Sequence, residues 1–247
     1  MNEPRILSYR RHTLPVRIMH WINVLTLTVM LGSGLQIFNA HPMLNWGRQS
    51  YDGAAALLDL GRGFPSWATL PSQQWLAMGR RWHLFFAWVL VANGLCYVVY
   101  SIRSRHLARD LAPDGGQLRG IGRSILDHLR LRHPAGVEAL RYNVLQKIAY
   151  LFVIFVLLPF IVVSGLGMSP RMDTFITGWV DLLGGRQSAR TLHFLAAAFL
   201  VAFVLVHVFE VVITGLWNNL RSMITGRYQI TPLPGESLPE RGESHDR

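Results

Sequence analysis

The sequence predicts an all-α integral membrane protein, a four-transmembrane-helix bundle with both termini in the cytoplasm. Of its 247 residues, 51% are hydrophobic and only 15% are charged, whereas soluble domains carry about 25% charged residues. Four apolar stretches are each long enough to cross a bilayer. Arginines collect in the segments that flank these stretches, which is typical of membrane proteins.

The four apolar stretches lie within one membrane domain, residues 1–228, followed by a Pro/Glu-rich tail, 229–247, predicted to be disordered and cytoplasmic. Pro159 should kink the third stretch, and Ser164 is expected to help satisfy the backbone that the proline frees. The predicted spans are 17–38, 81–102, 146–168 and 190–216.

Two of the connecting segments have informative compositions. Residues 39–79 are rich in Gly, Pro and Trp and too apolar for a disordered linker, so we expect short helices on the membrane surface or a docking face for a partner. Residues 120–131 within the basic segment 103–145 predict an amphipathic surface helix.

The distribution of Lys and Arg predicts the topology. The amino-terminal arm, segment 103–147 and the tail together hold 17 of these residues, and the two other loops hold 7. Because the richer side normally faces the cytoplasm, both termini are predicted inside, in a multi-pass protein of the plasma membrane surrounded by lipid.

Composition also excludes several classes of function. The net charge of +10 could suggest a nucleic-acid-binding protein, but the arginines flank apolar stretches and no basic helix with interleaved aromatics lies outside them. The single cysteine, Cys96, excludes an internal disulfide, a cysteine-ligated zinc site and a cysteine-ligated iron–sulfur cluster.

The fourth stretch carries two histidines, His193 and His207, fourteen residues apart. In a helix they share one face, separated by roughly 21 Å along the axis. His83 enters the second stretch from the outer side, at the depth of His193, and His20 enters the first from the inner side, at the depth of His207. Ionisable groups inside a membrane usually have a function. We therefore predict two bis-histidine haem b sites: His83 with His193 outside, and His20 with His207 inside.

A single histidine at a helix end could instead reach the interface without binding anything. That alternative is weakest for His207, deep in its span, and the matching depths weaken it for the whole set. The other histidines lie in loops or tails and are expected to be solvated: His12, His41, His106, His128, His133 and His245.

Arginines and glycines near these histidines are further candidates for cofactor binding. Arg17, Arg80 and Arg190 each lie three residues before a candidate ligand, on the same helix face, and could grip haem propionates. Gly34 and Gly94 could each leave room for the haem that their own helix does not ligate. The alternatives are ordinary interfacial arginines and glycines used for helix packing.

Glu210 lies three positions beyond His207. It could pair with an arginine, which is the favoured interpretation, or carry protons to a quinone near the inner haem.

Five segments together resemble the bacterial cytochrome b family, which includes the membrane subunits of Ni-Fe hydrogenases, formate dehydrogenases and thiosulfate reductases. The likeness reaches from residue 11 to about Tyr228. The segments are RHTLPVRIMHWIN (11–23), GRRWHLFFAW (79–88), RYNVLQKIAYLFVIFVLLP (141–159), GGRQSARTLHF (184–194) and VHVFEVVITG (206–215).

The resemblance implies a four-helix bundle with two haems b, ligated from helices one, two and four. It places the ligands at His20, His83, His193 and His207, the same four residues that the depths of the histidines in the membrane indicate. The branch it is most similar to occurs with molybdopterin oxidoreductases, which implies an extracytoplasmic redox partner and a quinone. The long loop 39–79 departs from the shortest family members, so their quinone-site positions are not carried over.

The predicted function is electron transfer between an extracytoplasmic oxidoreductase and the membrane quinone pool, as a subunit and not as a catalytic chain. The alternatives are a stand-alone haem oxidoreductase of the superoxide or ferric type that uses quinone, and a transporter or metal-binding membrane protein without haem.

Overall fold

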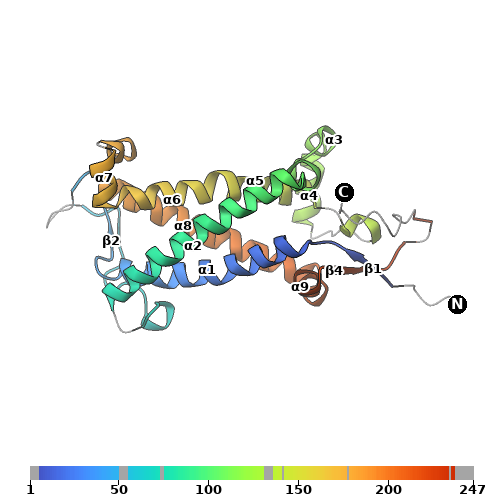
Figure 1. Cartoon of the computed structure of the whole chain (residues 1–247), viewed down its shortest axis with the longest axis horizontal. Coiled ribbons are helices and arrows are strands. Elements are labelled where there is room, and N and C mark those ends of the chain that lie inside the picture. Colours follow the sequence, from blue (N-terminus) through green and yellow to red (C-terminus); the bar gives the residue numbers. More distant parts are fainter. Residues whose placement is uncertain are drawn as a thin grey trace. The chain divides into compact units, whose positions relative to one another are not determined.

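Four long helical segments carry the four apolar stretches (Figure 1). The computed structural model describes residues 6–49, 55–72, 75–130, 136–140, 142–176, 178–233 and 235–236. Each long segment is apolar and long enough to cross a membrane, so the predicted all-α membrane class is confirmed. The segments are α1 (Leu14–Phe38), α2 (Leu76–Arg103), α5 with η4 and α6 (Val144–Gly167), and α8 (Arg186–Ile213).

The third segment is not a continuous α-helix. It consists of α5 (Val144–Phe152), a π-helical turn η4 (Val153–Leu157) and α6 (Leu158–Gly167). Pro159 lies just after the π turn. Its ring has no N–H to donate and clashes with the carbonyl of the residue one turn earlier, Phe155, so an ordinary α-helical turn does not fit there. The helix accommodates the proline by widening the preceding turn.

The fourth segment ends slightly earlier than the predicted limit at residue 216. Helix α8 stops at Ile213, and α9 (Leu216–Thr225) begins after Gly215. Gly215 has a φ of 110°, a conformation that side chains other than glycine rarely adopt, and it separates the two helices. A second left-handed glycine, Gly226, ends α9.

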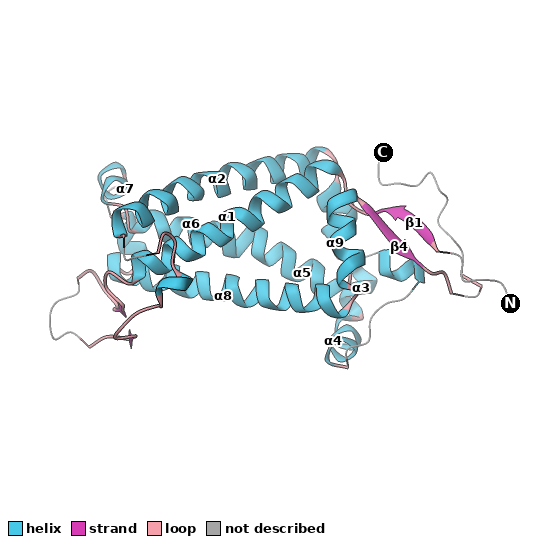
Figure 2. Cartoon of the chain, turned by 90° about the horizontal axis from the view of Figure 1, so that it is seen from below, coloured by secondary structure: helices cyan, strands magenta, loops and turns pink. Residues whose placement is uncertain are grey.

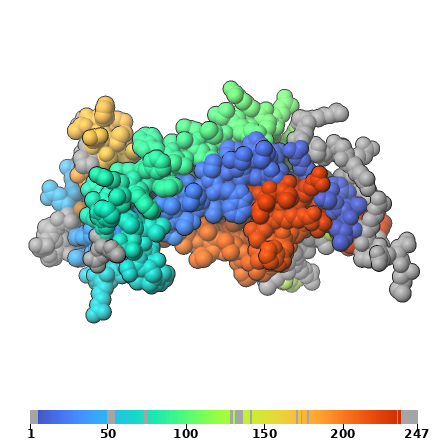
Figure 3. Space-filling model, turned by 60° about the horizontal axis from the view of Figure 1, so that its bottom comes forward, coloured from blue at the N-terminus to red at the C-terminus, as the bar shows by residue number. Residues whose placement is uncertain are grey.

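A two-stranded ribbon joins the two ends of the chain. Strand β1 (Leu7–Arg10) pairs antiparallel with β4 (Arg227–Ile230), with Leu7 opposite Ile230 (Figure 2). In the space-filling view, atoms from the start of the chain in blue lie against atoms from the end in red (Figure 3). The sequence did not predict this ribbon, and strand β4 includes the first two residues of the predicted tail; residue 234 and residues 237–247 of that tail lie outside the described residues.

Segment 39–79 contains little helix in its described part. It forms the short ladder β2 (Met43–Leu44) with β3 (Leu58–Asp59) and a 3-10 turn η1 (Ser66–Ala68) before α2 begins. Within residues 39–49 and 55–72 the only helix is the 3-10 turn η1, and the alternative of a docking face for a partner stays a prediction. Trp46, Trp67 and Trp75 are all exposed there.

The two remaining loops are mostly helical. The segment after α2 holds the π turn η2 (Leu107–Leu111), α3 (Gly115–Arg119), α4 (Ile121–Leu129) and the 3-10 turn η3 (Gly136–Leu140). Helix α4 covers the stretch predicted as an amphipathic helix. Before α8 lie α7 (Pro170–Phe175) and the 3-10 turn η5 (Trp179–Leu183). Gly185 then approaches Gly47 so closely that a Cβ would lie 2.7 Å from the Gly47 carbonyl oxygen.

The chain divides into two units, and every long helical segment contributes residues to both. We call residues Ile22–Gly94 and Val153–Phe203 the middle unit. The terminal unit consists of Met1–Trp21, Leu95–Phe152 and Val204–Arg247. In the middle unit, an apolar core packs α6 and its π turn against α8. Its buried members are Val153, Leu157, Ile161, Ala196 and Leu200.

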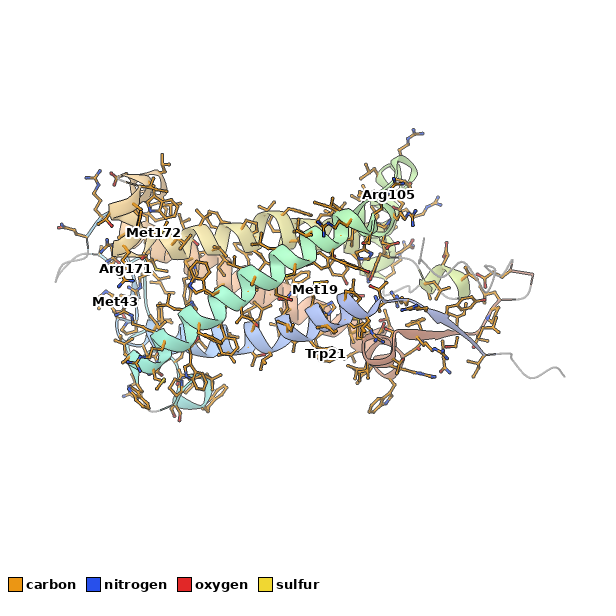
Figure 4. The ribbon with its side chains drawn as sticks, viewed as in Figure 1. Met19, Trp21, Met43, Arg105, Arg171 and Met172 are labelled. Atoms are coloured by element: carbon orange, nitrogen blue, oxygen red, sulfur yellow. The ribbon has the colours of Figure 1, made fainter. Side chains whose placement is uncertain are left out.

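In the terminal unit, the beginning of α1 packs against the end of the chain. Met19 is buried, whereas Trp21 is 40% exposed and donates its indole N–H to the carbonyl of Met223 at 3.1 Å (Figure 4). Thr13 and Tyr100 share a hydrogen bond of 2.7 Å between their hydroxyls, which ties the start of α1 to α2.

Candidate functional site

The four predicted ligands form two histidine pairs, one inside each unit. In the middle unit the ring centroids of His83 on α2 and His193 on α8 are 6.1 Å apart. In the terminal unit those of His20 on α1 and His207 on α8 are 6.3 Å apart. The partners within each pair are those that the sequence predicted from the depth of each histidine in the membrane.

Both separations suit one metal ion between two imidazoles. Metal–nitrogen bonds are about 2 Å long, so two rings bound to one ion through their nitrogens have centroids roughly 6 Å apart. The ring planes are inclined by 71° in the first pair and 64° in the second, so neither pair is stacked face to face.

The donor set matches a haem better than a bare metal ion. Among the described residues, no group of three or more His, Cys, Asp or Glu could hold a metal ion. A haem iron needs only two axial ligands from the protein, because the macrocycle supplies the other four nitrogens. A pair of histidines is therefore a donor set that fits a haem.

The imidazoles of the middle unit are fixed through their Nδ1 atoms. His83 Nδ1 lies 3.1 Å from the Met30 carbonyl oxygen and 3.2 Å from Ser33 Oγ. His193 Nδ1 lies 2.9 Å from the Ile161 carbonyl oxygen and 3.2 Å from Ser164 Oγ. Metal-bound histidines commonly use their second nitrogen in this way, which leaves Nε2 for the iron.

The sequence did not identify either serine as part of the site. Ser164 was expected to satisfy the backbone freed by Pro159, but its hydroxyl bonds to the Phe160 and Ile161 carbonyls and faces His193. In each case the only sign in the sequence was a serine inside a largely apolar stretch. Both Ser33 and Ser164 are fully buried.

The three predicted arginines have different environments. Arg190 donates Nη1 to the Met43 carbonyl at 2.9 Å and Nη2 to the His41 carbonyl, and its guanidinium lies over the Phe38 ring. Arg80 is exposed. In the part of the chain that the structure describes, the buried Nε of Arg17 has no hydrogen-bond partner, which suits an anionic group of a ligand. Propionate binding by all three arginines stays a prediction.

The two predicted glycines also differ. A Cβ on Gly34 would lie 3.4 Å from Cε1 of His83, so this glycine adjoins the imidazole of His83. A Cβ on Gly94 would meet no atom of the described residues within 4 Å, so open space adjoins it. The role of Glu210 likewise stays a prediction; its backbone carbonyl accepts hydrogen bonds from the backbone and hydroxyl of Thr214.

His12, which the sequence analysis expected to be solvated, instead packs near the ring of Tyr142, with centroids 6.4 Å apart. Its neighbour Arg11 lies over the rings of Tyr142 and Tyr228, at 5.6 and 4.6 Å from their centroids. Burial in the first place, and then the charge of Arg11, lowers the pKa of His12 from 6.5 to about 3.

This shift predicts a loss of stability in acid. Between pH 6.5 and 3 the unfolded chain protonates His12 and the folded chain does not. The contribution of His12 to the free energy of unfolding is therefore complete above pH 6.5 and is lost as the pH falls toward 3. The slope is at most about 1.4 kcal/mol per pH unit. We expect the melting temperature of His12→Gln to fall less than that of the wild type between pH 7 and pH 4.5. Circular dichroism of both proteins in detergent measures this difference. An identical fall in both proteins would contradict this assignment.

The chain is similar to known proteins over most of its length. A family model described as prokaryotic cytochrome b561 matches residues 11–226. A relative from Azospira oryzae, described as a putative protein-methionine-sulfoxide reductase subunit, is 33% identical over 220 residues, covering 88% of this chain and 97% of the relative. A probable Ni/Fe-hydrogenase B-type cytochrome subunit from Cupriavidus necator is 26% identical over 225 residues, covering 86% of this chain and 83% of that protein. No solved structure matches the chain significantly.

Proposed function

Because the chain belongs to the prokaryotic cytochrome b561 family, and is thus a membrane haem protein of the inner membrane, we propose that it carries electrons through two haems b. The electrons pass between an extracytoplasmic oxidoreductase and the membrane quinone pool. The observation that carries this proposal is the presence of two histidine pairs with ring separations of 6.1 and 6.3 Å, one in each unit.

The proposed axial ligands are His83 with His193 and His20 with His207. When bound, each haem supplies an iron that takes up and gives off one electron. The chain would supply the ligands, and it positions the imidazoles of His83 and His193 through hydrogen bonds at Nδ1. His193 Nδ1 faces the carbonyl of Ile161, a member of the apolar core of the middle unit, so this residue would hold its haem beside apolar side chains.

A redox partner is supported by the relatives, since both are described as subunits, one of a protein-methionine-sulfoxide reductase and one of a hydrogenase. We propose that this partner lies outside the membrane, as the resemblance implies. The resemblance noted in the sequence favours a molybdopterin-dependent partner for this chain. We further propose that the membrane domain spans residues 1–228, with the amino-terminal arm, the loop after α2 and the carboxyl end on the cytoplasmic side.

Quinol oxidation by the purified chain tests this function. We expect a short-chain quinol to reduce the b-type absorbance of the chain in detergent, because the quinone pool exchanges electrons with the haems directly. Superoxide and soluble ferric chelates should exchange electrons with it at least tenfold more slowly. Faster reaction with a soluble substrate than with quinol would instead favour a stand-alone oxidoreductase.

A further inference from the structure

We propose that two matching groups of residues, one on α1 and one on α6, position the imidazoles of His83 and His193 and hold the potential of their haem low. This inference rests on the proposed function, in which those histidines ligate one haem. We call the groups the α1 seat (Met30, Ser33 and Gly34) and the α6 seat (Ile161, Ser164 and Gly165).

The two seats have the same spacing and the same contacts. In each, a backbone carbonyl and the hydroxyl of a serine three residues later both face the Nδ1 of one imidazole. In the α1 seat the two distances are 3.1 and 3.2 Å, to His83. In the α6 seat they are 2.9 and 3.2 Å, to His193. A glycine follows each serine. Two different helices thus present the same arrangement to the two partners of one pair.

The hydrogen bonds determine which nitrogen carries the proton. Ser33 donates its hydroxyl to the Val29 carbonyl at 2.7 Å, and Ser164 donates to the Phe160 carbonyl at 2.8 Å. With their protons engaged, both serines can only accept from the imidazoles, and a carbonyl always accepts. Each Nδ1 therefore donates, and each neutral imidazole keeps the lone pair of Nε2 for a metal.

The glycines allow the rings to lie this close to the helix. A Cβ on Gly165 would be 3.2 Å from Cε1 and 3.4 Å from Nδ1 of His193. On Gly34 it would be 3.4 Å from Cε1 of His83. At Gly165 an added Cβ would be tighter than an ordinary contact and would press on the His193 ring, whereas at Gly34 it would lie at van der Waals distance from the His83 ring.

The α6 seat also gives a role to a helix that has no histidine. Helix α6 supplies no ligand to either pair, and α1 supplies only His20, which belongs to the other pair. In the middle unit both helices instead support ligands that α2 and α8 provide. The third span is thus part of the site through its backbone carbonyl and its buried serine.

The seats have an electronic consequence. Acceptors on Nδ1–H increase the electron donation of an imidazole and stabilise the more oxidised iron. Removing the serine oxygens should weaken this donation and make the haem easier to reduce. For Ser33→Ala/Ser164→Ala we expect the reduction equilibrium of one b-type component to shift about tenfold toward the reduced form, ~59 mV for a one-electron couple. The other component should stay unchanged.

The measurement is a potentiometric titration of the b-type absorbance of purified holoprotein, with electron paramagnetic resonance of the low-spin ferric signals. Thr28→Ala is a matched control, because Thr28 on α1 makes the same bond to a carbonyl four residues earlier, at 2.7 Å, but is exposed. It should leave both potentials unchanged. Ser33→Thr and Ser164→Thr keep the hydroxyl and should restore the wild-type potential.

Each outcome decides the matter. Unchanged potentials in the double alanine variant, or equal shifts in both components, would overturn the role of the seats. If the alanine variants lose the haem, the threonine variants decide: retention at the wild-type potential supports the seats, and loss overturns them. His83→Ala separates the two proposals, because a variant that still binds both haems contradicts the proposed function itself.

Discussion

Replacing His193 by alanine is expected to remove one of two haems and to leave the other with its wild-type spectrum and potential. The imidazole is one of the two proposed protein ligands in the middle unit, and the ring centroid of its partner His83 is 6.1 Å from its own. Loss of even a hydrogen-bonding partner of a ligand costs about 10–100-fold in metal affinity, so loss of the ligand itself should empty the site.

The measurement is the haem content per chain by the pyridine haemochrome method, which should fall from two to one. His41→Gln is a suitable control, because His41 belongs to the same unit but to neither histidine pair. It should retain both haems. Retention of two haems by His193→Ala would show that this histidine is not an axial ligand.

Combining substitutions should reveal which histidines share a haem. His20→Ala/His207→Ala removes both ligands of one site and should cost no more haem than either single variant. His20→Ala/His83→Ala removes one ligand from each site and should cost both haems. The reason is that His20 and His207 lie within one unit, at 6.3 Å, and His83 and His193 within the other. Circular dichroism of each variant checks that the helices persist.

Much of the site could be predicted because helices have a fixed rise and period. Fourteen residues between His193 and His207 determine their face and their separation along α8. The direction in which each span enters the membrane then assigns His83 and His20 to different levels. None of this requires knowledge of side-chain packing, which explains why the sequence led to the same pairs that the structure brings together.

The two seats could not be predicted in the same way. Whether Ser33 faces His83 depends on how α1 is rotated about its axis relative to α2, and that rotation is set by the packing of many apolar side chains. A serine in an apolar helix also bonds its own backbone, as Ser164 does to the Phe160 carbonyl, so its presence alone predicts no ligand.

The β1–β4 ribbon escaped prediction for a different reason. Its strands have four residues each and lie at opposite ends of the chain, and polar segments this short carry little periodicity. The position of Arg11, over the rings of Tyr142 and Tyr228, follows from the ribbon and was missed with it. The early end of α8 depended on the left-handed conformation of Gly215, which a glycine permits but does not require.

The central claim is that each histidine pair holds one haem. The haem content of the two double variants tests it most directly, since both proteins lack two histidines and differ only in how those are distributed. We expect one haem per chain in His20→Ala/His207→Ala and none in His20→Ala/His83→Ala. Equal haem contents in the two variants would contradict it.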